Sequence, residues 1–196
     1  KFGGTSVGSV DSIRQIQHII GQQTDDCIVV VSALGGITDQ LLKAAHLALE
    51  AGEEYMEVYQ AIRCRHMDMV NTLITNPTTR QMLCLELEGI LDELRSILFG
   101  VHLVKDLSDK TEAAIVSYGE RMSSRIVTAA LPGAVRKNSL QFIRTEHKQG
   151  QVLLNTELTE QLIRQAFSPT PHLSVVPGFI SRDSQTDEIT NLGRGG

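Results

Sequence analysis

The fold is decided by the first six residues, Lys1-Phe2-Gly3-Gly4-Thr5-Ser6, which have the pattern of a strand end, a glycine turn and the approach to a helix. Because Gly3 and Gly4 lack a Cβ atom, a phosphate can approach their amide groups closely. The start of the following helix offers further amide groups and the positive end of its dipole. Lys1 adds a positive charge, and Thr5 and Ser6 add hydroxyl groups. The stretch predicts a phosphate-binding turn, although a plain strand–turn–helix corner with a surface lysine would use the same residues, and no Walker A motif occurs in the chain.

The composition limits the classes of function. The chain has 196 residues, a formal charge of −5, 41% hydrophobic and 4% aromatic residues and no tryptophan. This length permits one substantial core, and the charge and scarce aromatics argue against a nucleic-acid surface. The chain has no membrane-spanning apolar run and no histidine spacing typical of zinc, and we expect no signal peptide. Cys27, Cys64 and Cys84 are odd in number and widely spaced, so we expect free thiols in a cytoplasmic protein.

The first forty residues predict a βαβ unit. An apolar stripe of helical period runs through residues 9–21, and Cys27–Val31 is a continuous apolar run typical of a strand covered on both faces. A glycine loop follows, and Thr38 is the expected N-cap of a further helix. We therefore expect an α/β fold, a three-layer αβα sandwich with a mainly parallel sheet and functional loops at the carboxyl ends of its strands.

Residues 39–110 are expected to form a helical insertion. Two long helices are predicted over 53–75 and 78–100, with the break at Asn76-Pro77. Leucines recur every three or four residues in the second helix, which indicates a core-facing stripe. The sequence leaves open whether this insertion shapes a substrate pocket or a subunit interface.

The second half of the chain alternates between the two element types. We expect Ser117–Ser124 to open a helix that ends near Pro132, a weak strand over 140–143, a helix over 155–167 and a buried strand over 173–176. Residues 179–182 and 188–191 are expected to pair as a hairpin.

Four polar, glycine-bearing motifs lie along the chain, and their order resembles the aspartokinases of the amino-acid kinase family. They read K-F-G-G-T-S from Lys1, V-S-A-L-G-G-I-T from Val31, G-E-R-M-S from Gly119, and V-P-G-F from Val176 followed by L-G-R-G-G. The resemblance covers essentially the whole chain and is strongest to the kinase half of bifunctional aspartokinase/homoserine dehydrogenases.

The resemblance implies ATP-dependent phosphorylation of the side-chain carboxylate of L-aspartate, which begins biosynthesis of lysine, threonine, methionine and isoleucine. The carboxylate is itself the nucleophile, so the protein supplies charge and positioning. Lys1 would stabilise the transferred phosphoryl group, and Gly3, Gly4, Thr5 and Ser6 would hold phosphate. Mg²⁺ is implied as an ion held mainly through the ATP phosphates.

The same resemblance assigns four residues to aspartate. Arg194 would bind a substrate carboxylate through its two-pronged guanidinium, and Glu120 would bind the ammonium group. Ser32 and Thr38 would add hydroxyl contacts. Three of them have a simpler alternative: an exposed carboxylate near a helix start for Glu120, a strand-end turn for Ser32 and a helix cap for Thr38.

We expect the chain to be the substrate-binding part of a truncated kinase domain, without its nucleotide-binding part and regulatory domains, and inactive alone. The full-length enzyme is expected to be a homo-oligomer without nucleic-acid or membrane partners. Two other functions remain open: another carboxylate or carbamate kinase of the same family, or a catalytically dead amino-acid sensor. The feedback inhibitor and the presence of a dehydrogenase domain stay undetermined.

Overall fold

The computed structural model describes residues 1–148 and 150–192. At its centre is a parallel three-stranded sheet in the order β1-β5-β2, formed by β1 (Cys27–Val31), β5 (Leu173–Pro177) and β2 (Val135–Arg136). In the register of β1 and β5, Cys27 lies opposite Leu173 and Val31 opposite Pro177. The carboxyl ends of these two strands therefore meet at one edge of the sheet. Phe2 extends this edge by a parallel bridge to Val31.

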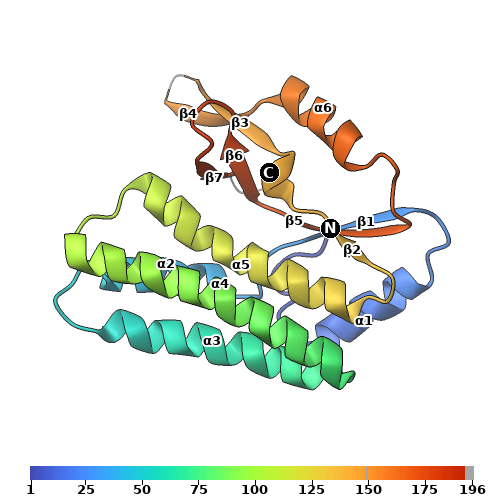
Figure 1. The fold of residues 1–196 in the computed structure, drawn as a ribbon, viewed down its shortest axis with the longest axis horizontal. Coiled ribbons are helices and arrows are strands. Elements are labelled where there is room, and N and C mark those ends of the chain that lie inside the picture. Colours follow the sequence, from blue (N-terminus) through green and yellow to red (C-terminus); the bar gives the residue numbers. More distant parts are fainter. Residues whose placement is uncertain (149, 193–196) are drawn as a thin grey trace.

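Helices lie on both sides of the strands, with α1 to α5 on one side and α6 on the other (Figure 1). The helices are α1 (Val10–Gly21), α2 (Ile37–Leu47), α3 (Glu54–Leu73), α4 (Pro77–Val104), α5 (Asp109–Ala130) and α6 (Thr156–Ala166). None of the described helices is long and apolar enough to cross a membrane. The predicted α/β fold with a parallel sheet between helical layers is confirmed.

A second sheet has the order β4-β3-β6-β7. Its strands are β4 (Gln151–Leu154), β3 (Arg144–Lys148), β6 (Ile180–Asp183) and β7 (Ile189–Asn191). The predicted hairpin is present as the antiparallel pair β6–β7, whose turn is held by Asp183 Oδ1, which accepts the amides of Gln185 and Thr186 at 2.8 Å each.

The long helices pack because each buries one apolar stripe. Leu87, Leu91, Leu94 and Leu98 of α4 are fully buried and join the core that α2, α3 and α5 share with the central sheet. The break before α4 follows from its cap: the Asn76 side chain accepts the amide of Thr79 at 3.0 Å, and Pro77 occupies the first turn, where its missing amide hydrogen costs nothing.

Three local predictions are wrong. Ser117–Ser124 does not open a helix, because α5 begins at Asp109 with Ser108 as its cap, and the segment lies mid-helix. Thr38 does not cap α2, since Gly36, at φ +79°, precedes its first residue Ile37. Residues 140–143 form no strand, because a short 3-10 helix, η1 (Ser139–Gln141), occupies that position and β3 begins after it.

Candidate functional site

The glycine turn and the loop after β1 lie side by side at the carboxyl edge of the central sheet. The amide of Phe2 donates to the carbonyl oxygen of Val30 at 2.8 Å, and the amide of Ser32 donates to that of Phe2 at 3.1 Å. Beside them, the amide of Gly178, just after β5, donates to the carbonyl of Val31 at 2.8 Å. Three chain segments that are distant in sequence thus converge on one edge, the expected position for ligand binding in an open α/β sheet.

Close backbone contacts favour glycine at three positions, two between the loops and one within the first loop. A Cβ atom at Gly35 would lie 3.1 Å from the carbonyl oxygen of Gly4, and one at Gly4 would lie 3.2 Å from that of Ala33. A Cβ at Gly8 would lie 3.0 Å from the Gly4 oxygen. A side chain at Gly4 or Gly35 would push the two loops apart, and one at Gly8 would crowd the glycine turn itself.

The loops present backbone donors at this contact. The amide groups of Gly3, Gly4, Thr5 and Ser6 have no acceptor among the described residues, and neither do those of Gly35 and Gly36. Successive amide donors in a glycine-rich turn form a concavity that suits an anion. Lys1 and the hydroxyl-bearing residues Thr5 and Ser6 are exposed beside it.

Glu120, in the middle of α5, brings a buried carboxylate to the same loops. Its side chain is 3% exposed, and Oε1 accepts the amide hydrogen of Ala33 at 3.0 Å. Oε2 is buried and has no hydrogen-bond partner among the described residues. The alternative role of an exposed carboxylate at a helix start is therefore wrong. A buried carboxylate oxygen without a donor is costly, and a bound cation or ammonium group would satisfy it.

Burial also sets the proton affinity of this group. Loss of solvation raises the pKa of Glu120 from 4.5 to about 7, and the hydrogen bond from the Ala33 amide opposes the rise. The carboxyl group therefore titrates close to neutral pH. A positively charged ligand group would favour its ionised form.

The neighbours of Glu120 fix its position. A Cβ at Gly119 would lie only 2.7 Å from the Cβ of Ala33, so glycine lets the helix approach the loop. One turn further along α5, the hydroxyl of Ser123 donates to the carbonyl of Ser32 at 2.7 Å. The contacts at Gly119, Glu120 and Ser123 join α5 to the loop after β1.

The segment after β5 carries backbone strain at this edge. Phe179 has φ +63°, and the amide of Ile180 donates back to the carbonyl of Gly178 at 2.6 Å across it. A three-residue turn with positive φ is rare and strained, and such strain tends to occur at functional sites.

The structure brings most of the predicted residues together. Lys1, Gly3, Gly4, Thr5 and Ser6 lie in the turn next to the loop that begins with half-buried Ser32, and half-buried Thr38 lies in the first turn of α2. Arg194 lies outside the described residues.

Sequence reasoning missed several contributors. Gly8, Gly35 and Ser123 lie inside or next to the quoted motifs, but their contacts join segments far apart in sequence. Arg65 of α3 places one guanidinium nitrogen 3.4 Å from the carbonyl oxygen of Gly8. Only a pairing of the helical insertion with the glycine loops could have revealed it.

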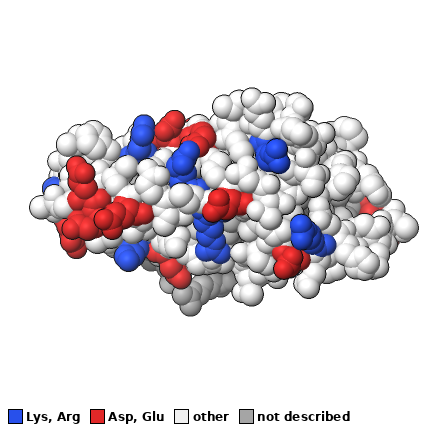
Figure 2. All heavy atoms as spheres, turned by 90° about the horizontal axis from the view of Figure 1, so that it is seen from below, with Lys and Arg blue, Asp and Glu red and all other residues white. Residues whose placement is uncertain are grey.

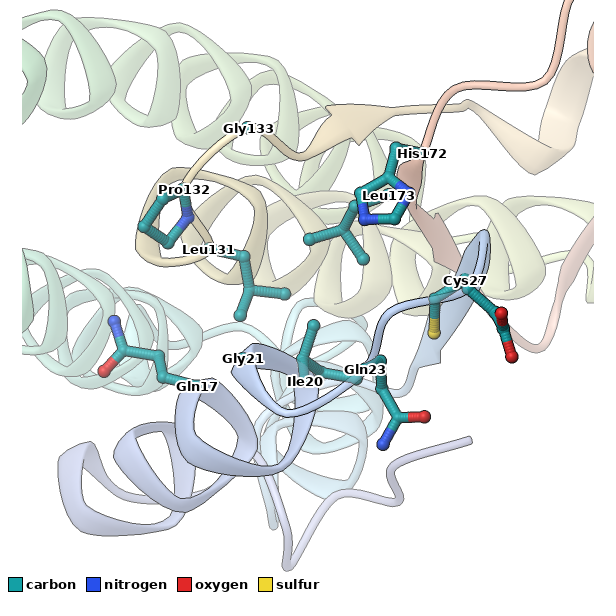
Figure 3. A pocket seen from close by; sticks show the side chains of 11 residues that line it. Gln17, Ile20, Gly21, Gln23, Cys27, Leu131, Pro132, Gly133, His172 and Leu173 are labelled. Atoms are coloured by element: carbon teal, nitrogen blue, oxygen red, sulfur yellow. The ribbon is translucent and has the colours of Figure 1, made fainter.

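A cavity of about 300 Å³ occupies the opposite end of the sheet (Figure 3). It is lined by Gln17 and Ile20 of α1, Cys27 at the start of β1 and Leu131 and Pro132 after α5. None of the residues assigned to phosphate or substrate lines it, so we place the candidate site at the carboxyl edge.

Comparison with known proteins shows that the chain is similar in sequence to aspartokinases. The chain is 28% identical to aspartokinase 1, chloroplastic, of Arabidopsis thaliana over its whole length, which spans 35% of that protein. It is also 28% identical to the bifunctional aspartokinase/homoserine dehydrogenase 2 of Escherichia coli, of which it spans 24%. The chain thus covers about a third or less of these relatives.

Solved structures of an aspartokinase also match the fold of the chain. Aspartokinase III of E. coli superimposes on the whole chain with a TM-score of 0.86 and 26% identity in its complex with lysine and aspartate, and with 0.85 and 25% in its complex with aspartate and ADP. In each case the chain covers 43% of the matched chain.

The model of the amino acid kinase family matches residues 1–196. With the predicted motifs assembled at one edge of the expected fold, the chain belongs to the amino acid kinase family.

Proposed function

We propose that the protein carrying this chain transfers the γ-phosphoryl group of ATP to the side-chain carboxylate of L-aspartate, producing 4-phospho-L-aspartate and ADP. The observation that carries the proposal is Glu120: a buried carboxylate with one oxygen held by Ala33 and the other without a partner among the described residues, beside two amide-rich glycine loops. The relationship to aspartokinases supports the choice of substrate.

Each described residue has a distinct task in this proposal. Glu120 Oε2 accepts a hydrogen bond from the ammonium group of aspartate, and the ion pair holds Glu120 ionised despite its burial. Ser32 and Thr38 supply hydroxyl groups at the same loop. Arg194, whose position the structure does not describe, is proposed to bind a substrate carboxylate.

The reaction requires no base from the protein. A carboxylate oxygen of aspartate attacks the γ-phosphorus, the bond between that phosphorus and the β–γ bridging oxygen breaks, and ADP leaves with the electron pair. The amides of the glycine turn and the Lys1 ammonium stabilise the negative charge on the phosphoryl oxygens.

The described residues fit a phosphate chain, because the glycine contacts leave backbone amides open to an anion. They form no group of three acidic, histidine or cysteine side chains that could hold a metal. Mg²⁺, when bound, would neutralise phosphate charge and would be held mainly by ATP itself.

The parts that hold adenine and ribose, and any regulatory domains, are proposed to lie outside residues 1–196, with residues 39–110 as the helical insertion. We further propose that the full enzyme acts in the cytoplasm as a homo-oligomer, with no nucleic-acid or membrane partner.

The test is aspartate-dependent ADP formation by the full-length protein that carries this chain, with Glu120→Ala and Glu120→Gln beside it. We expect both variants to lose most of the turnover. Glu112 is a half-exposed residue on the same helix, and we expect Glu112→Gln to keep the turnover. ATP consumption with another carboxylate or with carbamate, but not with aspartate, would overturn the substrate. If Lys1→Ala left the biological function intact, the protein would be a sensor and not a kinase.

A further inference from the structure

The outward face of α4 carries an apolar seam. Seven residues with the spacing 3-4-3-4-3-4 form it: Met82, Leu85, Gly89, Asp92, Ser96, Phe99 and Leu103. All seven are exposed, and the four large apolar side chains are between 50% and 68% exposed. This spacing is the heptad repeat of a helix–helix seam and continues over three heptads.

The seam is not the edge of the buried stripe of α4. The buried residues of the helix include Leu83, Leu87, Leu94 and Leu98. At 3.6 residues per turn these lie on the opposite side of the helix from the seam. The helix therefore has two apolar faces, and among the described residues only one of them packs on the core.

Ion pairs border the seam on both sides. Toward α3, Arg63 Nε donates to Glu88 Oε2 at 3.0 Å. Toward α5, Arg121 contacts Glu93 at 2.7 Å and Arg125 contacts Glu86 at 2.5 Å. Charged pairs thus flank the exposed apolar side chains of the seam, as polar residues flank the buried part of a protein interface.

The position of α4 makes the seam accessible. In Figure 1 the helix lies on the near side of the molecule, between α3 and α5. The adjoining face, seen from the α3 side, has Lys and Arg interspersed with Asp and Glu, and acidic side chains gather at one end (Figure 2). The exposed apolar side chains of the seam thus lie next to a surface rich in charged side chains, which is typical of a face in contact with solvent.

The seam residues also complement themselves in an antiparallel pair. When two copies run in opposite directions, Leu85 can lie opposite Leu103 of the partner subunit. Gly89 then lies opposite Phe99 of the partner subunit, a small residue facing a large one. Asp92 faces Ser96 of the partner subunit at the centre.

Charges at the centre fit the same arrangement. Asp92 and Arg95 form an ion pair of 3.4 Å within each helix. In the antiparallel register these pairs approach with opposite signs adjacent. We propose that a second copy of this chain binds the seam, α4 against α4 about a two-fold axis near residue 94.

Disulfide cross-linking in the full chain tests the register. In a Cys64→Ser background, which removes an exposed native thiol, we expect Leu85→Cys/Leu103→Cys to form a dimer on mild oxidation. The two positions are 18 residues apart, about 27 Å on one helix, so they cannot cross-link within a chain. The single variants are the matched controls, and neither should form a dimer above the background level.

Two cross-linking results would contradict the antiparallel pair. Failure of the double variant to cross-link above the background level would overturn the proposal, and self-cross-linking by Leu85→Cys alone would show a parallel pair instead. Thiol labelling of Leu85→Cys should be fast in dilute protein and suppressed at high concentration. Protection at every dilution would mean that another part of the same chain covers the seam.

A charge substitution gives a second measure. We expect Phe99→Glu to weaken association on the order of tenfold or more by sedimentation. Leu153→Glu, at an exposed leucine of β4, should leave association unchanged. Equal association constants for the two variants would contradict the α4 interface.

Discussion

Glu120 and Ala33 are 87 residues apart, yet the carboxylate oxygen Oε1 of the first accepts the amide hydrogen of the second at 3.0 Å. This bond holds a titratable group in the protein interior at the end of β1. Because burial raises the pKa of this group to about 7, the stability of the fold depends on the protonation of one side chain.

We predict that Glu120→Gln changes the pH dependence of unfolding. The pKa of Glu120 is about 7 in the folded chain against 4.5 ordinarily, so the folded state binds the proton more tightly. The contribution of this group to stability is therefore present at low pH and lost as pH rises from about 4.5 to 7, by about 3 kcal/mol. Urea unfolding of the full chain and the variant across this range measures the difference, and parallel pH profiles would contradict it.

We predict that His66 changes the pH dependence of stability in the opposite direction to Glu120. It is fully buried, its Nδ1 donates to the carbonyl of Ile62 at 2.7 Å, and burial lowers its pKa to about 4. The unfolded state therefore binds more protons, and stability rises with pH between about 4 and 6.5. His66→Leu should remove this rise.

The two effects oppose each other between pH 4.5 and 6.5, so we expect a nearly flat profile there for the unmodified chain. Glu120→Gln should show a rising profile and His66→Leu a falling one. Two flat variant profiles would show that neither group titrates as its burial implies.

Gly119→Ala should destabilise the fold by about 1–3 kcal/mol, because its Cβ would lie 2.7 Å from that of Ala33 in a packed contact. Gly100→Ala in α4 is the matched control. Its Cβ would meet nothing within 4 Å, so the gain in helix propensity should stabilise the chain by up to about 1 kcal/mol. The denaturant midpoint should fall for Gly119→Ala and rise for Gly100→Ala. Equal shifts of the midpoint for both variants would contradict the packing argument.

Gly35→Ala should impair catalysis without unfolding the chain. The new Cβ would lie 3.1 Å from the carbonyl oxygen of Gly4 and push the two glycine loops apart. We expect kcat/KM for ATP to fall by about tenfold or more in the full chain, since small displacements of positioning groups are costly. Gly21→Ala, where a Cβ meets nothing within 4 Å, should keep full activity; an equal loss there would point to a general effect of the substitution.

Much of the fold could be predicted because it depends on local patterns. The continuous apolar run Cys27–Val31 is β1 to the residue, and the stripes of α1 and α6 appear where their periodicity places them. The helix predicted over 155–167 is present as α6, and Asn155 precedes it as its cap, with a side chain that accepts the amide of Leu158 at 3.1 Å.

The errors arose where tertiary structure overrides local preference. The polar segment Ser117–Ser124 has the composition of a helix start, yet its three serines are buried, and each donates to a backbone carbonyl. Thr38 was expected as a cap, but Gly36 supplies the left-handed conformation that the loop requires.

The same distinction between local patterns and tertiary contacts applies to the candidate site. Its residue types could be taken from the motifs, whereas the burial of Glu120 and the contact of Gly4 with Gly35 could not. Both depend on chain segments that meet only after folding. Sequence periodicity carries no information on which loop a mid-helix carboxylate will face.

Helix α5 runs without interruption from Asp109 to Ala130 and carries Glu120 near its middle. Its first turns contact the β6–β7 hairpin, where Lys110 pairs with Glu188 and Asn191 Nδ2 donates to the carbonyl of Ala113 at 3.5 Å. Its last residue, Ala130, accepts a hydrogen bond from Gln17 of α1 at 2.6 Å. One continuous helix therefore connects three places: the β6–β7 hairpin at its start, the candidate site at Glu120, and the residues Leu131 and Pro132 after its end, which line the cavity at the opposite end of the sheet.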